Sequence, residues 1–177
     1  METVRFRHAH FSARFPVDCR YAPSHFWMRP AEAAAGQAGA AEDDAPRLWH
    51  VGFTKFATRM LGELVEMVLE VQPGDRVAGG QRLGTVEGFK AVSDLFCVID
   101  GTFSAANPAL TAEACLTHSD PYGAGWLYTV QGTPAAGHLD VHGYIALLTE
   151  TIDRLQASRY SDAAGDDAGK TDQGDDA

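Results

Sequence analysis

The sequence lacks the features that mark several common classes of protein. No apolar run approaches the roughly 20 residues that cross a bilayer, so the 177-residue chain is not expected to span a membrane. Lys and Arg number only 14 against 24 Asp and Glu, and this net charge of -10 argues against binding to nucleic acid, whose phosphates attract basic surfaces. The three cysteines show no metal-ligand spacing and fit a reducing compartment.

Lysine is also scarce, and Lys90 is the only one between Lys55 and Lys170. The run 62–71 before it alternates as a half-buried strand does. Its predicted inward residues are Val65, Met67, Leu69 and Val71. Turn signals at 72–75, 78–80 and 100–101 separate further strand-like runs at 83–86 and 95–99. The pattern predicts antiparallel strands with Lys90 on a hairpin tip, where a lysine is a point of attachment.

The residues around this lysine resemble the lipoyl-attachment signature of the glycine cleavage system H-protein family. The matching residues are Glu87, Lys90, Ala91, Val92, Ser93, Asp94 and Leu95. The chain departs from the family at Gly88 and Phe89, where serine and valine are usual. Further segments similar to the family are 21–27, 51–57, 61–65, 73–75, 107–110 and 120–127. The resemblance therefore covers roughly residues 20 to 150.

This resemblance implies a mainly β fold, a flattened sandwich of the lipoyl or biotinyl type (a barrel-sandwich hybrid) with peripheral helices. It also implies lipoate in amide linkage on Lys90, with Glu87, Gly88, Phe89 and Ala91 flanking it at the hairpin tip. Biotinyl domains usually flank their lysine with methionines, so lipoate is favoured over biotin. Glu87 is expected to be either a recognition charge or an ordinary solvated one, and Phe89 to pack across the hairpin or to touch a partner.

The resemblance further implies a function. A member of the family shuttles an aminomethyl group between glycine decarboxylase, the tetrahydrofolate-dependent aminomethyltransferase and dihydrolipoamide dehydrogenase, after a lipoate ligase or a lipoyl or octanoyl transferase has modified it. The cofactor supplies the reactive sulfurs, so the protein is expected to be a carrier and not an enzyme. Two alternatives are a related lipoyl carrier of another pathway (sulfur oxidation or lipoate relay) and an unmodified interaction module.

The expected carrier domain is residues 20–157, with one segment before it, one inserted within it and one after it. Residues 1–19 alternate as a strand does and are predicted to form an ordered extension on the domain edge. Their arginines also suit a mitochondrial transit peptide, although the bacterial cytoplasm is the simpler location. The alanine-rich run 30–47 is predicted to be a flexible insertion, and the acidic run 158–177, with no large apolar side chains after residue 160, a disordered tail.

Two helices complete the prediction. Thr54 is expected to cap a short helix that ends near Gly62. Asp140 is expected to cap a second helix from Val141 to about Leu155. Its apolar stripe would be Tyr144, Leu147, Leu148, Ile152 and Leu155. Cys97 is predicted to be a small buried hydrophobe, and the spaced pairs His8 with His10 and His138 with His142 lack a clear third metal ligand.

Overall fold

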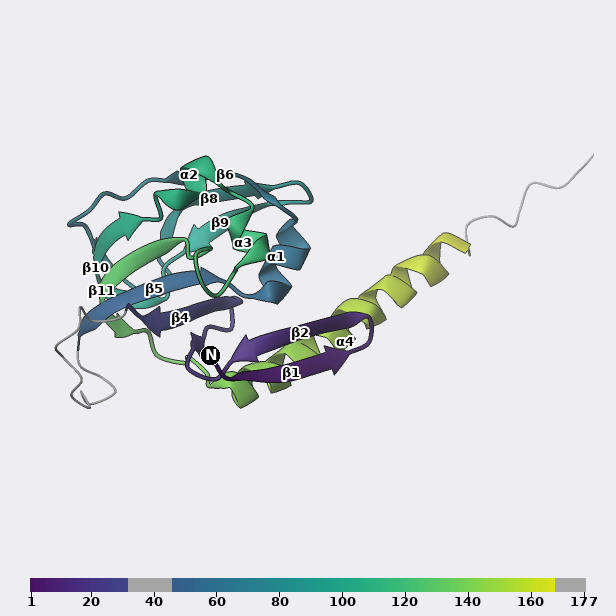
Figure 1. Ribbon diagram of the computed structural model, residues 1–177. Helices are drawn as coiled ribbons and strands as arrows, with labels where there is room; N and C mark the ends of the chain where they lie inside the picture. The colour runs from purple at the N-terminus through teal and green to yellow at the C-terminus, as the bar shows by residue number, and fades with distance from the viewer. Residues whose placement is uncertain (32–45, 168–177) are drawn as a thin grey trace, which may run out of the picture.

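A computed structural model describes residues 1–31 and 46–167 (Figure 1). Its strands are β1 (Thr3–His8), β2 (Phe11–Pro16), β3 (Arg20–Tyr21), β4 (Phe26–Pro30), β5 (Arg47–Phe53), β6 (Leu64–Leu69), β7 (Arg76–Val77), β8 (Arg82–Gly88), β9 (Val92–Phe96), β10 (Ile99–Ala106) and β11 (Tyr128–Pro134). Its helices are α1 (Lys55–Leu61), α2 (Ala109–Ala112), α3 (Leu116–Ser119) and α4 (Val141–Asp167). Within this part of the chain no helix is long and apolar enough to cross a membrane.

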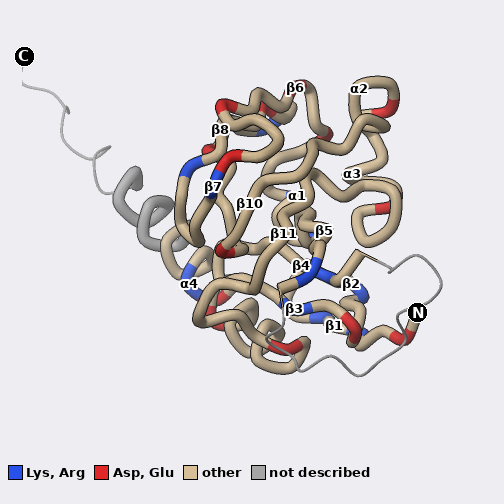
Figure 2. Tube along the Cα trace, turned by 90° about the vertical axis from the view of Figure 1, so that its left-hand side faces the viewer, with Lys and Arg blue, Asp and Glu red and all other residues tan. Residues whose placement is uncertain are grey.

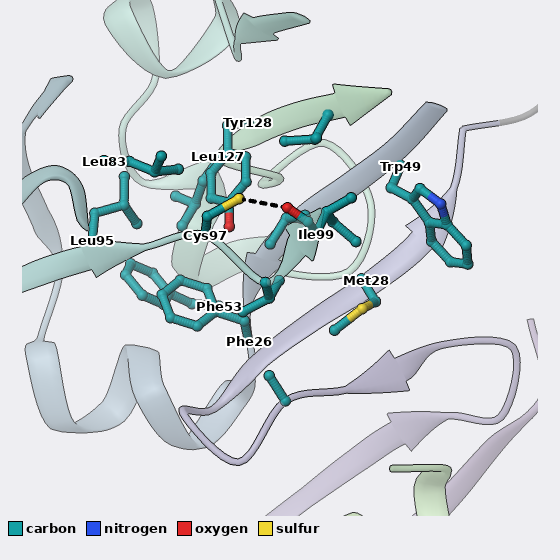
Figure 3. Close-up of a cluster of buried hydrophobic side chains, with 14 of the residues drawn as sticks. Phe26, Met28, Trp49, Phe53, Leu83, Leu95, Cys97, Ile99, Leu127 and Tyr128 are labelled. Carbon is teal, nitrogen blue, oxygen red and sulfur yellow. Dashed lines mark hydrogen bonds between the residues drawn. The ribbon is translucent and has the colours of Figure 1, made fainter. Parts of the chain in front are cut away.

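Two antiparallel sheets form the body of the protein. One has six strands in the order β3-β4-β5-β11-β10-β7, and the other has three in the order β6-β8-β9. Apolar side chains from both sheets meet in one core, part of which is drawn in Figure 3, with Leu83 and Leu95 from the smaller sheet against Phe53 and Tyr128 from the larger. The predicted β-sandwich with peripheral helices is confirmed.

The hairpins that lead to Lys90 agree with the predicted order, but β6, the first of these strands, differs in one detail. Its pairing with β8 shifts register between Leu64 and Glu66. This irregularity changes which side chains face inward. Leu64 is buried, while Val65, predicted to point inward, is 51% exposed. A bulge cannot be located by alternation alone, because the pattern assumes an uninterrupted strand.

Helix α1 begins and ends as predicted. The hydroxyl oxygen of Thr54 accepts a hydrogen bond from the amide of Ala57, and Gly62 terminates the helix with a φ of 83°. The hydroxyl satisfies one of the orphan amides of the first turn, and glycine adopts the positive φ without a clash between Cβ and the backbone. These two caps fix the helix that supports the lysine hairpin.

The first 16 residues form a hairpin, β1 paired with β2, that packs on α4 (Figure 1). A second apolar cluster joins them: Phe6, Phe11 and Phe15 from the hairpin meet Tyr144 and Leu148 from α4. Tyr21 lies between, stacked on Tyr144 with ring centroids 4.7 Å apart. The amino-terminal extension is thus placed on the outer side of the six-stranded sheet.

Three predicted boundaries need correction or fall outside the described residues. Helix α4 continues to Asp167 and so includes the first ten residues assigned to a disordered tail, because each residue added to a formed helix gains a hydrogen bond without a new nucleation cost. Leu155, predicted on its apolar stripe, is 40% exposed. Pro30 and Arg47, assigned to the insertion, end β4 and begin β5. Residues 32–45 and 168–177 of the predicted insertion and tail lie outside the described residues.

Candidate functional site

Lys90 lies at the tip of the β8–β9 hairpin. The amide of Gly88 donates to the carbonyl of Ala91 at 2.9 Å and closes the turn. Glu87, Phe89, Lys90 and Ala91 are all exposed at this tip, whereas Gly88 is buried. The structure therefore brings the predicted site residues together on one turn, with the lysine directed away from the core.

The hairpin tip rests on the end of α1 and on the residues that follow it. The amide of Lys90 donates to the carbonyl of Leu61, and that of Phe89 donates to the carbonyl of Glu63, both at 3.0 Å. These bonds fix the backbone of the lysine and leave its side chain free to move, an arrangement suited to a rigidly mounted arm.

Two glycines make this close approach feasible. A Cβ at Gly88 would lie 2.4 Å from the carbonyl oxygen of Leu61, so a side chain there would push the hairpin off the helix. A Cβ at Gly62 would lie 3.1 Å from both the amide nitrogen and Cγ of Lys90. The glycine at position 88, where the family usually has serine, is therefore explained by local packing, because the backbone of the turn lies directly against α1.

The Lys90 side chain has one polar contact, with Nζ 3.4 Å from the carbonyl oxygen of Arg59. At that distance the hydrogen bond is weak. Among the described residues no carboxylate forms an ion pair with the amine, and neighbouring Glu87 is exposed without an ion pair of its own. The amine of Lys90 is thus accessible from solvent.

Exposed apolar side chains surround the lysine. Phe89 is 77% exposed, Val92 69% and Met60 46%. Phe89 does not pack across the hairpin, so that one of its two predicted roles is wrong, and contact with a partner stays a prediction. Large solvent-exposed hydrophobic groups clustered beside a functional residue are typical of a contact surface.

A groove of about 450 Å³ runs beside this cluster, between α1 and the start of β9. Its walls are largely apolar and include Phe53, Phe56, Met60 and Val92, with His25 at one side. The one carboxylate on its wall, Asp94, accepts a hydrogen bond from Arg82 at 2.7 Å. The groove was missed in the sequence, because residues 24–26 reach the lysine hairpin only through the pairing of β4 with β5.

His25 connects this groove to α4. Its Nδ1 lies 3.0 Å from the hydroxyl of Tyr144, which lies 2.8 Å from the hydroxyl of Thr54, the cap of α1. Burial lowers the pKa of His25 to about 4, so the ring is neutral at pH 7. The helix that carries the lysine hairpin is thereby linked at its opposite end to α4.

The cysteines and histidine pairs form no second site. Cys97 is buried, as predicted, and its Sγ lies 3.1 Å from the carbonyl oxygen of Ile99 (Figure 3). Burial raises the pKa of the Cys97 thiol to about 11, which keeps it protonated and unreactive. No group of three metal-ligating side chains lies together anywhere in residues 1–31 and 46–167.

A β-sandwich that presents an accessible lysine on a braced hairpin tip defines a lipoyl- or biotinyl-type carrier domain. Comparison with known proteins identifies the family of carrier domains to which the chain belongs. The family model described as glycine cleavage H-protein matches residues 37–140. The chain belongs to the glycine cleavage H-protein family, and the resemblance noted in its sequence is confirmed.

Individual relatives agree with this assignment. The glycine cleavage system H protein of Mycobacterium avium is 38% identical over 142 residues, which cover 76% of this chain and 97% of the relative. That of Corynebacterium jeikeium is 34% identical over 131 residues, which cover 74% and 94%. The crystal structure of the Mycobacterium marinum H protein superposes with a TM-score of 0.60 at 35% identity and covers 75% of this chain and 97% of that one. Proteins of this family are non-catalytic lipoyl carriers.

Proposed function

We propose that this chain is the lipoyl carrier of a glycine cleavage system, with lipoate joined by an amide bond to Lys90. In this role it moves an aminomethyl group between glycine decarboxylase, the tetrahydrofolate-dependent aminomethyltransferase and dihydrolipoamide dehydrogenase. The observation that supports the attachment site is the exposed Lys90 side chain on a backbone held by Leu61 and Glu63. Free buried thiols at Cys19 and Cys97 fit the reducing bacterial cytoplasm that we propose as its location.

The residues around Lys90 suit a lipoyl group. Its dithiolane would supply the redox and group-transfer chemistry, which the side chains of the protein do not provide. Acylation needs an uncharged amine, and Lys90 has no carboxylate partner among the described residues to hold its charge. The neighbouring groove, of about 450 Å³ and mostly apolar, is matched to a thin hydrocarbon chain. The hairpin tip would hold the arm, and the groove would orient it.

Intact mass spectrometry after coexpression with a lipoate ligase tests the attachment. We expect one lipoyl addition in the wild type and none in Lys90→Arg. Lys55→Arg is the matched control, because Nζ of Lys55 donates to the carbonyl of His118 at 2.7 Å and is partly buried. An addition that persists in Lys90→Arg, or that disappears in Lys55→Arg alone, contradicts the proposal.

The pathway has a separate test. The lipoylated chain, mixed with glycine decarboxylase, should support exchange of labelled bicarbonate into the carboxyl group of glycine, and the unmodified chain should not. A lipoylated protein that gives no exchange with the decarboxylase of its own organism would instead place the carrier in another lipoate-dependent pathway.

A further inference from the structure

The outer face of the β1–β2 hairpin carries an arginine cluster, defined here as Arg5, Arg7 and Arg14. Side chains alternate along the middle of the two strands, so that Phe6, Phe11 and Phe15 point into the second apolar cluster and the arginines point to solvent. All three arginines are exposed. The packing of the inner face therefore fixes the orientation of the basic outer face.

None of the three members of the arginine cluster forms an ion pair with a residue in the described part of the chain. Their side chains also form no hydrogen bond with the described residues. Arg29 and Arg82 differ in this respect, because Arg29 contacts Asp18 and Arg82 contacts Glu70. Arg5 and Arg14 are direct cross-strand partners. Like charges placed opposite each other on a ladder are unfavourable, so the arrangement does not serve stability.

The cluster also stands out against the charge of the whole protein. Residues 1–31 contain five arginines and two acidic residues, a balance of +3, within a chain of net charge -10. Figure 2 shows basic positions along β1 and β2, while acidic positions are frequent over the rest of the trace. A local positive face on an acidic protein attracts a negatively charged partner surface, which the acidic remainder of the protein would repel.

The hairpin lies next to the helix that supports the lysine. The guanidinium of Arg59 lies 5.5 Å from the ring centroid of Phe11, at the start of β2. The carbonyl oxygen of the same Arg59 lies 3.4 Å from Nζ of Lys90. Arg7, opposite Ser12, is the cluster member nearest that end of the hairpin in the strand register. Arg59 thus links the turn end of the hairpin to Lys90, while the arginine cluster projects from the opposite, solvent-exposed face of the same hairpin.

We propose that the arginine cluster of the β1–β2 hairpin docks the acidic rim of an enzyme that works on the Lys90 arm. The proposal rests on the proposed carrier function. It goes beyond that function because the hairpin precedes residues 37–140, which the family model matches. Charges at the rim of a contact accelerate encounter without holding the complex tightly, which suits a carrier that must leave each enzyme after every visit.

The test uses the lipoylated full chain as the substrate of the decarboxylase, the aminomethyltransferase and dihydrolipoamide dehydrogenase from the same organism. We expect Arg5→Gln/Arg7→Gln/Arg14→Gln to lower kcat/KM about tenfold at low salt for at least one of them, with kcat unchanged. The wild type should lose a similar factor between about 20 and 300 mM NaCl, and the variant should lose little, because screening removes the same attraction.

Two single substitutions, each of which removes one positive charge, provide the matched control. Arg7→Gln should lower kcat/KM about twofold at low salt, whereas Arg76→Gln, which removes an exposed arginine on β7, should leave it unchanged. Equal effects of the two substitutions would indicate a response to net charge alone and would overturn the proposal. Unchanged kinetics of the triple variant with all three enzymes would overturn it as well.

Two further measurements separate the remaining outcomes. Intact mass, recorded first, shows whether the arm is present, so a missing lipoyl group counts against the proposed function and not against docking alone. Amide chemical shifts of the isolated protein show whether its own acidic segments, 32–45 or 168–177, already cover the arginine cluster. If those amides shift in the triple variant, the cluster binds its own chain and the docking proposal is wrong.

Discussion

Replacing Gly62 with alanine should destabilise the turn on which Lys90 rests. Gly62 has φ 83° and ψ -167°, a region that only glycine occupies readily, and forcing another residue there costs on the order of 1–3 kcal/mol. The new Cβ would also lie 3.1 Å from the Lys90 amide, which cannot retreat without losing its bond to Leu61. We therefore expect the upper part of that range, ~2–3 kcal/mol, against a typical domain stability of about 5–15 kcal/mol.

Urea unfolding gives the free energy, and the rate of lipoylation by a lipoate ligase reports the position of the lysine. Gly80→Ala is a close control, because Gly80 has φ 82° but nothing within 4 Å of an added Cβ. It should cost about 1–2 kcal/mol through the backbone alone and leave the lipoylation rate unchanged. Equal losses of stability in the two variants, or equal lipoylation rates, would refute the argument that Gly62 positions the lysine hairpin.

Three further predictions concern protonation and exposure. Burial lowers the pKa of His25 to about 4 from its ordinary 6.5, so unfolded chains bind the proton first and stability should fall by about 2 kcal/mol as the pH drops from about 6.5 to about 4. His25→Asn, which tolerates the positive φ of 67°, should reduce this loss in urea unfolding at pH 7 and pH 4.5, and an unchanged pH dependence would count against the assignment. Burial raises the pKa of Cys19 to about 12 and that of Cys97 to about 11, so iodoacetamide at pH 8 should add one label to the native protein, at exposed Cys115, and three in urea, as counted by intact mass. Phe89→Ser should leave stability within about 0.5 kcal/mol, since the ring is 77% exposed, but should slow lipoylation about tenfold through loss of an aromatic contact with the ligase; a wild-type rate would show that the ring contacts nothing there.

Local signals predicted much of the fold around Lys90. The alternation of residues and the turn dipeptides indicated the hairpins, and the cap residues indicated α1, because each of these signals acts over a few neighbouring positions. The bulge at Val65 and the continuation of α4 to Asp167 were not predicted. Both depend on a strand partner or on helix propagation, which the periodicity of one segment does not report.

The site was predicted only as far as it is contiguous in sequence. Residues 87–91 lie together on one turn, so a motif could find them. The bracing by Leu61 and Glu63, the groove wall at His25 and the link through Tyr144 join segments far apart in the chain. Such contacts follow from the packing of the two sheets and α4. The sequence indicated the helix caps and the apolar stripe of α4, but not which segments these residues would contact.

The pairing of the first hairpin with the last helix sets an order for folding during synthesis. His8 contacts Asp153, 145 residues later in the chain. At roughly 5–20 residues per second, a ribosome needs on the order of ten seconds to make that interval. Throughout it, Phe6, Phe11 and Phe15 lack the α4 surface that later buries them. The amino-terminal hairpin of the nascent chain thus exposes its aromatic face until translation is almost complete. We therefore expect this segment to bind chaperones at the ribosomal exit.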